Sequence, residues 1–343
     1  MGGGVFKLRA RRHVSHFQRT RNATGRDPDH RHAHGGEPTR IVVDGIDETA
    51  LIGTSVAEAR DHFADAHDQL REFLMREPRG HDDMFGAVPV ETDDADLGVF
   101  FMDTDGYLDM CGHALIGVVT ALSESGRIER QSSLTVETPA GLVDAALEWD
   151  GDRVTSVTFE NVSSYQCDTV RVDFGGYTVR ADVVYAGNRF ALVDAAAIGG
   201  SFDETPISAF VDAGLDLRAS VNEASPRNPM TGEAMTVDGV EFYEDGGHRS
   251  VVVFADGSVD RSPCGTGTCA KMTYLHHLGA LDVDEAYLSE GPIGTTFEGR
   301  LLDATERDGV WVTRPEITGS AHVTGEHTFY RRPTDDLAGF TVR

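Results

Sequence analysis

The sequence predicts an α/β (α+β) protein built from two similar domains in tandem. β-Branched runs alternate with helical patterns along the chain, and such alternation is typical of sheets packed against helices. Two apolar helices, each preceded by a Cys-Gly pair, lie 153 residues apart, and flanking motifs repeat at the same spacing. The 343 residues and the 40% hydrophobic fraction suffice for one large or two medium cores.

The N-terminal segment differs in composition from the rest of the chain. Residues 1–34 are rich in arginine and histidine within an acidic protein, so we interpret them as a disordered extension outside the fold. The first domain is expected to cover residues 35–165 together with the C-terminal segment 320–343. The second domain is expected to cover residues 166–319.

Regular elements begin after this extension. The β-branched run at residues 40–43 predicts a strand, and a turn at Asp44-Gly45 separates it from a helix over about residues 56–75. Further strands are predicted over residues 154–159, 179–185 and 250–254. Strands and helices therefore alternate in both halves of the chain.

An internal repeat surrounds the two Cys-Gly pairs. Cys111-Gly112 precedes an apolar helix over residues 114–123, and Cys264-Gly265 precedes another over residues 269–278. Each helix ends at a glycine 15 residues after its cysteine, and the 153-residue offset continues in the downstream motifs Glu-Thr-Pro-Ala-Gly and Glu-Gly-Pro-Ile-Gly. Upstream, each cysteine follows a strand and an Asp-Gly turn, at an offset of 151 residues. We infer a duplicated domain.

The two cysteines stand where the start of a helix can stabilise an anion. Free backbone N–H groups and the helix dipole are expected to lower the pKa of Cys111 and Cys264. Gly112 and the run from Gly265 to Thr268 allow backbone amides to approach a substrate carboxylate. If the helix starts face each other, one thiolate can remove an α-proton while the other thiol protonates the opposite face. This chemistry requires no cofactor, and no metal site is predicted.

The neighbouring polar residues admit two interpretations each. His113 is either a half-buried histidine or a substrate contact, and Asp260 either caps the turn into Ser262-Pro263 or holds a substrate ammonium group. The other two cysteines, Cys167 and Cys269, lack a duplicated context, and we interpret them as structural. Four widely spaced cysteines without a CxxC pair favour reduced thiols over a disulfide scaffold.

The charge distribution restricts the partners and the compartment. The formal charge is −27, the acids are dispersed, and only two of the 30 basic residues are lysines. We interpret this as adaptation to a high-salt cytoplasm, which argues against nucleic acid as a partner. No run of about 18 apolar residues exists, so we expect a soluble cytoplasmic protein without a membrane partner. The α-proton chemistry of the two thiols predicts a small amino-acid substrate. The oligomeric state stays open, a homodimer included.

Two motifs around the cysteines resemble those of the proline racemase family. They are Met110-Cys-Gly-His113 and Asp260-Arg-Ser-Pro-Cys-Gly-Thr-Gly-Thr268. The resemblance implies a diaminopimelate-epimerase-like fold, with two pseudo-symmetric domains that each wrap a sheet around a central hydrophobic helix. It also implies acid–base thiols at Cys111 and Cys264, a nitrogen contact at Asp260, and a carboxylate site formed by Gly112, His113, Gly265 and Thr266.

The resemblance implies a racemase or epimerase of a cyclic imino acid. Ala114-Leu115 follow the first motif where well-known proline racemases have Asn-Thr, which slightly favours 4-hydroxyproline over proline. Alternatives are an epimerase of another amino acid, such as diaminopimelate, and a redox or binding protein in which the two cysteines form a disulfide. The family's trans-3-hydroxyproline dehydratases carry threonine at the second catalytic position, so Cys264 argues against that activity.

Overall fold

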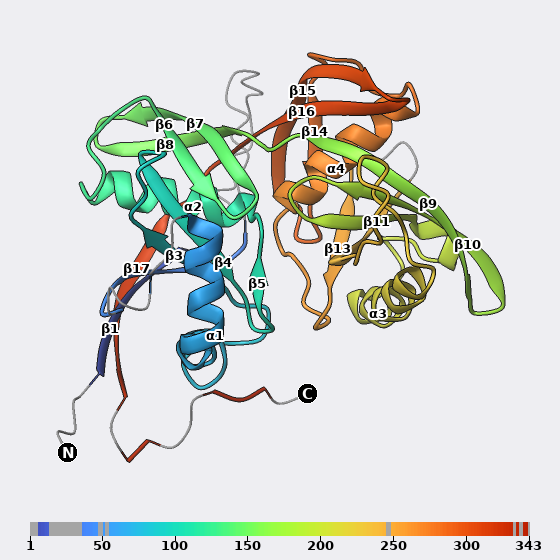
Figure 1. Cartoon of the computed structure of the whole chain (residues 1–343). Helices are drawn as coiled ribbons and strands as arrows, with labels where there is room; N and C mark the ends of the chain where they lie inside the picture. The colour runs from blue at the N-terminus through green and yellow to red at the C-terminus, as the bar shows by residue number, and fades with distance from the viewer. Residues whose placement is uncertain are drawn as a thin grey trace, which may run out of the picture.

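The computed structural model describes residues 6–13 (backbone), 36–46, 51, 55–244, 248–331, 334–335 and 339–341. Their elements gather into two lobes, with α1 and α2 in the first and α3 and α4 in the second (Figure 1). Within the described residues, no helix has the length and apolar character needed to cross a membrane.

The two lobes contain the following elements. The first lobe holds β1 (Phe6–His13), β2 (Thr39–Asp44), α1 (Val56–Met75), β3 (Phe85–Val90), β4 (Leu97–Met102), β5 (Tyr107–Leu108), α2 (Gly112–Glu124), β6 (Ser133–Thr138), β7 (Gly141–Asp150), β8 (Arg153–Glu160) and β17 (Val323–Arg331). The second lobe holds β9 (Ser164–Phe174), β10 (Tyr177–Tyr185), β11 (Arg189–Asp194), the 3-10 helix η2 (Ala195–Ile198), α3 (Ile207–Glu223), β12 (Gly239–Tyr243), β13 (Ser250–Phe254), α4 (Gly265–His277), β14 (Tyr287–Glu290), β15 (Thr296–Arg307) and β16 (Val310–Gly319).

The same strand pairing occurs in both lobes. β2 is parallel to β3, which is antiparallel to β4, and β11 is parallel to β12, which is antiparallel to β13. A meander follows the central helix in each lobe, β6-β7-β8 in the first and β14-β15-β16 in the second. The α/β fold class with two pseudo-symmetric halves is therefore confirmed.

A buried helix occupies the centre of each lobe. Residues 112–123 of α2 and 265–274 of α4 are all buried, because the strands of their own lobe surround them. A helix covered on all sides has no need for a polar face, which explains the apolar run that follows Cys111. The outer helices differ: α1 buries only one side, and its N-cap Ser55 accepts a hydrogen bond from the Glu58 N–H.

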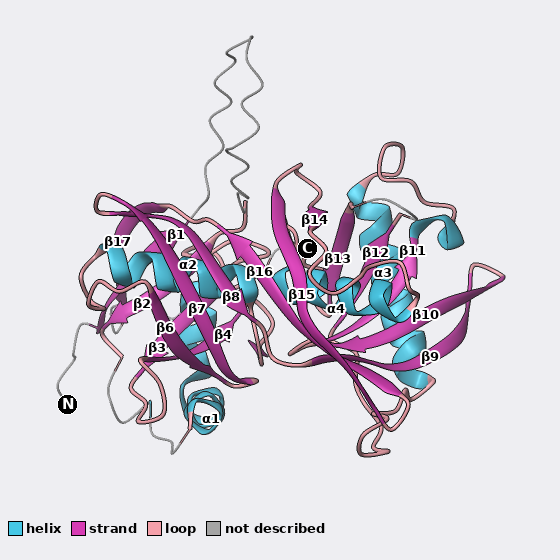
Figure 2. Cartoon of the chain, turned by 90° about the horizontal axis from the view of Figure 1, so that it is seen from above, coloured by secondary structure: helices cyan, strands magenta, loops and turns pink. Residues whose placement is uncertain are grey.

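The lobes share one hydrogen-bonded network of strands. β16 pairs with β8 of the first lobe as well as with β9 and β15 (Figure 2), and the chain then returns to the first lobe as β17. The chain crosses between lobes next to residues 161–163 and 320–322. We propose that these crossings mark the boundaries between a first domain of residues 35–165 with 320–343 and a second of residues 166–319.

The N-terminal extension contains a strand. Phe6–His13 form β1, which pairs antiparallel with both β17 and β2. The expectation that residues 1–34 are disordered is therefore wrong for these eight residues. Their strand depends on partners that lie about 30 and 320 residues further along the chain, which composition cannot reveal. Residues 1–5 and 14–35 lie outside the described residues.

Candidate active site

Each of the two cysteines is the N-cap residue of a central helix. Cys111 and Cys264 have extended backbones, with φ and ψ of −144° and 101° and of −66° and 122°, and helical geometry begins at the following glycine. The second helix therefore starts four residues earlier than predicted. Glycine and threonine are weak helix formers, but the first turn leaves its N–H groups free for other partners.

The two helix starts touch each other through glycines. A Cβ atom added to Gly112 would lie 2.9 Å from the Gly265 Cα, and one added to Gly265 would lie 2.8 Å from the Gly112 Cα. Neither position therefore accommodates a side chain without movement. Because the positive ends of two helix dipoles meet here, the contact region favours an anion such as a carboxylate.

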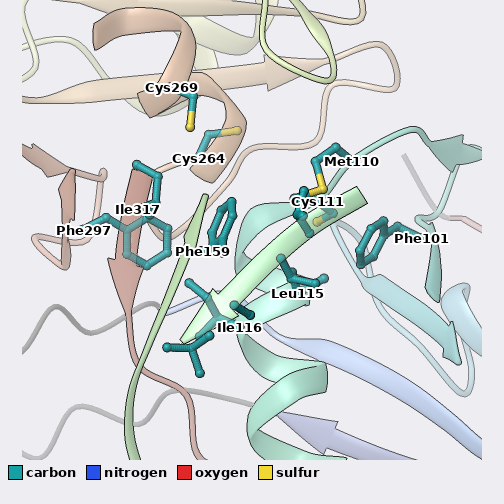
Figure 3. Packing of buried hydrophobic residues seen from close by; sticks show 14 of the residues in the cluster. Phe101, Met110, Cys111, Leu115, Ile116, Phe159, Cys264, Cys269, Phe297 and Ile317 are labelled. Atoms are coloured by element: carbon teal, nitrogen blue, oxygen red, sulfur yellow. The ribbon is translucent and has the colours of Figure 1, made fainter. Parts of the chain in front are cut away.

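The thiols lie in one buried cluster that spans both lobes. Cys111 and Cys264 are each 5% exposed and belong to the same apolar core, with Phe159 of β8 beside them (Figure 3). The Cys111 Sγ lies 3.6 Å from the His113 Nδ1, and the Cys264 Sγ lies 3.7 Å from the Thr266 Oγ1. His113 and Thr266 are separated by the repeat offset, so each thiol has a polar neighbour at the equivalent position.

The environment opposes ionisation of both thiols. Burial raises the pKa of Cys111 and of Cys264 well above the ordinary value, and the negative charge of Asp260 adds to this effect. The N–H groups of Ala114 and Gly267 act in the opposite direction, and the Gly267 N–H donates to the Cys264 Sγ over 3.4 Å. The helix N–H groups favour the thiolate, but burial has the larger effect, so the prediction that the pKa values of both cysteines are lowered is wrong.

His113 and Asp260 are both buried beside the thiols. Burial lowers the pKa of His113 to about 3, so its ring is neutral, and the ring meets the edge of Phe85 with centroids 4.7 Å apart. Asp260 is 1% exposed, and burial raises its pKa to about 7. Asp260 can therefore gain or lose its proton near neutral pH.

An ion-pair network joins the lobes next to Asp260. The backbone N–H of Arg261 donates to the Glu37 carboxylate, and its guanidinium lies 3.3 Å from the same carboxylate and 3.0 Å from that of Asp83. Glu37 and Asp83 belong to the first lobe, and Arg261 belongs to the second. The sequence analysis assigned no role to Glu37, because its partner Arg261 lies 224 residues away in the chain.

Asn188 connects the two cysteine segments. Its side-chain N–H₂ donates to the Met110 carbonyl over 2.6 Å and to the Thr266 Oγ1 over 3.2 Å. Asn188 was also missed as a functional residue, because its partners lie 78 residues away on either side. Its position between Gly187 and the buried strand β11 was the available signal.

The structure brings all seven predicted site residues to one region. Within the described residues, no group of three or more histidine, cysteine or acidic side chains is arranged to hold a metal ion. Cys269 is fully buried inside α4, and Cys167 lies on β9, so neither reaches the helix starts. The seven residues are Cys111, Gly112, His113, Asp260, Cys264, Gly265 and Thr266.

The fold and the site define an isomerase of the amino-acid racemase and epimerase class. The model of the family described as Proline racemase matches residues 30–341, and the chain belongs to this family. It is similar to a hydroxyproline epimerase from Agrobacterium vitis, solved with bound trans-4-OH-L-proline, with a TM-score of 0.83 and 27% identity over 98% of this chain and 96% of that chain.

Curated relatives carry several activities. The chain is 38% identical to the proline racemase of Acetoanaerobium sticklandii, over 90% of this chain and 96% of that protein. It is also 38% identical to the 4-hydroxyproline 2-epimerase of Streptosporangium roseum, over 88% and 93%. A trans-3-hydroxy-L-proline dehydratase from Bacillus thuringiensis is 36% identical, over 88% and 93%. The overall sequence identity to these relatives therefore does not distinguish between their substrates.

Proposed function

We propose that the protein inverts the α-carbon of a cyclic imino acid, 4-hydroxyproline or proline, by proton transfer between Cys111 and Cys264. The observation that carries this proposal is the contact between Gly112 and Gly265. It brings the N-terminal ends of two pseudo-symmetric helices together, with one thiol at each end. Such an arrangement supports a mechanism in which the two thiols approach a bound α-carbon from opposite sides.

The reaction needs one base and one acid at a time. One thiolate takes the α-proton, and the electron pair of the broken C–H bond moves into the carboxylate to form an enediolate. The other thiol then protonates the opposite face and becomes the thiolate. Positioned acid–base groups contribute about 10² to 10⁴-fold each, and backbone N–H groups at Gly112, His113, Gly265 and Thr266 stabilise the enediolate.

Substrate binding is expected to generate the thiolate. The ring nitrogen of a cyclic imino acid is a cation at neutral pH, and Asp260 is the carboxylate assigned to hold it. Asp260 has a pKa of about 7, so the incoming cation favours its ionised form. The same positive charge offsets the burial that raises the thiol pKa values.

The experiment that tests this proposal measures α-proton exchange in deuterium oxide. We expect deuterium at the α-carbon and inversion with trans-4-hydroxy-L-proline or L-proline, the former being favoured by Ala114-Leu115 after the first motif. Exchange with diaminopimelate, measured in the same way, would instead indicate an epimerase of another amino acid. Absence of exchange with every proline derivative would overturn the proposal.

A dehydratase is the second candidate because one relative of similar identity carries that name. Loss of water from trans-3-hydroxy-L-proline needs a base for the α-proton but no acid on the opposite face. Cys264 supplies such an acid, which favours inversion. Release of the dehydrated product from trans-3-hydroxy-L-proline, without exchange on the other substrates, would favour the dehydratase.

A redox or binding function of the two thiols makes a different prediction. All four cysteines are free thiols in the structure, which fits the cytoplasmic location that we propose. The variants Cys111→Ser and Cys264→Ser should both abolish inversion if the two thiols act as a pair. A protein that only forms a disulfide between the two thiols would show no inversion even as the wild type, and a function that depends on one thiol would survive in one of the two variants.

A further inference from the structure

A buried pair of charges lies behind Cys264. Glu241 of β12 is 1% exposed, and Lys271 of α4 is 2% exposed. Lys271 is one of two lysines in a chain with 30 basic residues, and its Nζ lies 3.6 Å from the centroid of the Tyr243 ring. Buried charges of this kind are costly unless they compensate each other, so the pair requires an explanation.

The strand position of Glu241 is apolar in the other lobe. In the second lobe, Leu192, Glu241 and Val252 form a row across β11, β12 and β13, on the sheet face that packs against α4. The equivalent row across β2, β3 and β4 of the first lobe is Ile41, Ala87 and Phe101. Ile41 and Leu192 are 151 residues apart, and so are Phe101 and Val252. This is the offset of the upstream repeat. Glu241 therefore corresponds to Ala87.

The helix positions differ in the same way. Lys271 corresponds to Val118 of α2 at the 153-residue offset, and Gly267 corresponds to Ala114. Ala87, Ala114 and Val118 are 0% exposed and belong to the apolar core. The two lobes thus share their backbone arrangement, whereas only the second lobe carries a carboxyl group on the sheet and an ammonium group on the central helix at these positions.

Gly267 allows the carboxylate to approach Cys264. A Cβ atom added to Gly267 would lie 3.0 Å from the Glu241 Oε2, 2.9 Å from the Cys264 Cβ and 3.3 Å from the Cys264 Sγ. The carboxylate and the thiol therefore adjoin the same small space, which the methyl group of Ala114 fills in the first lobe. The Gly267 N–H also donates to the Cys264 Sγ.

We propose that Glu241, compensated by Lys271, is a positioning residue for Cys264 that keeps the proton on this thiol and so makes the two thiols unequal. What this difference between the thiols means for turnover rests on the proposed two-thiol function. The carboxylate is the member of the pair that adjoins the thiol. Burial raises the pKa of Glu241 to about 7, so Glu241 is ionised in the alkaline range where a thiol with a raised pKa loses its proton, and its negative charge there opposes ionisation of the sulfur. The approach of the Glu241 carboxylate to Cys264 beside Gly267 lies within the second lobe. It therefore does not depend on how the two lobes are positioned.

Other charged groups also face the thiols. Asp260 acts on both Cys264 and Cys111, and Glu37 and Asp103 act on Cys111. Glu37 is compensated by Arg261, and Asp103 accepts hydrogen bonds from the backbone N–H groups of residues 105 and 106. Glu241 acts on Cys264 and also on Cys269 and Asp260 of its own lobe, so neutralising it should affect Cys264 more than Cys111 of the other lobe.

The test measures the rate at which iodoacetamide alkylates each cysteine as a function of pH, with the four sites resolved by peptide mass spectrometry. In Glu241→Gln, the pH midpoint for Cys264 should fall by about one unit, while that of Cys111 should stay near its wild-type value. Equal shifts at both thiols, or no shift at Cys264 in a variant with unchanged thermal unfolding, would overturn the proposal.

A second variant guards against misfolding of the first. The triple variant E241A/G267A/K271V gives the second lobe the residues found in the first, and replacing a buried charge pair by apolar residues is often neutral or stabilising. It should also show a lowered Cys264 midpoint, by less than in Glu241→Gln because the ammonium group of Lys271 is absent as well, and a wild-type midpoint would contradict the proposal. Because alkylation needs no turnover, a shifted midpoint in a protein without racemase activity would reject the proposed function but support this positioning role.

Discussion

At the scale of single residues, burial and charge decide when the site can react. The pKa of both thiols of the candidate site is raised, and that of Asp260 is raised to about 7. All three groups are therefore protonated at acidic pH. In the proposed mechanism, a thiol must lose its proton to act as a base, and Asp260 must lose its proton to hold the cationic nitrogen of the substrate.

These shifts predict loss of activity in acid. The value of kcat/KM should fall as the pH drops through about 7, because Asp260 becomes neutral there. Asp260→Asn should lower kcat/KM at pH 8 by about 10 to 100-fold, the effect of losing a charged hydrogen bond, and should remove this limb of the pH profile. A variant that keeps the wild-type pH profile would show that Asp260 does not control binding.

At the scale of elements, the head-to-head contact of α2 and α4 creates the place where we propose that the substrate carboxylate binds. The contact depends on glycine at two positions that the repeat makes equivalent, Gly112 and Gly265. The backbone there is helical, so an alanine would be acceptable to each helix alone. The restriction comes from the opposite lobe.

Alanine at these glycines should separate the helix starts. In Gly112→Ala, the added methyl group would meet the Gly265 Cα at 2.9 Å, and overpacking of this kind costs about 1 to 3 kcal/mol. We expect kcat/KM to fall at least about 100-fold, because the carboxylate site loses its geometry. Gly106→Ala is the control, since its added atom would contact nothing within 4 Å. Equal activity of the two variants would contradict this role.

The elements also show which features were accessible to sequence reasoning. Local patterns correctly predicted α1, the strand at residues 250–254 and the duplicated cysteine helices. They could not predict that β8 pairs with β16, or that Glu241 faces Gly267, because these contacts join segments far apart in the chain. The start of α4 was misplaced because its first turn consists of weak helix formers.

At the scale of the whole molecule, the site exists only while the two lobes are together. Besides the shared strands, Arg261 of the second lobe joins Glu37 and Asp83 of the first. The Thr104 hydroxyl also donates to Asp256 across the lobes over 2.7 Å. Arg261 follows Asp260 directly in the chain and Asp256 precedes it by four residues, so we expect these contacts to couple the relative position of the lobes to the proposed chemistry.

Breaking this network should weaken substrate binding and stability together. Arg261→Met leaves the fully buried Glu37 side chain without its guanidinium partner, and we expect a loss of about 2 kcal/mol in the free energy of unfolding. The KM should also rise. The double variant E37Q/R261M removes the unpaired charge and should regain part of the stability. Additive effects in this cycle would show that the two side chains act independently.

The charge of the molecule predicts a dependence on salt. A formal charge of −27 repels itself in the compact state, and salt shortens the range of this repulsion from about 10 Å at 0.1 M to about 3 Å at 1 M. The thermal unfolding midpoint should therefore rise by about 5 °C or more between 0.1 and 2 M KCl. Sucrose at the same osmolality controls for exclusion of solutes from the surface. An equal rise in sucrose, or no rise in KCl, would argue against adaptation to a high-salt cytoplasm.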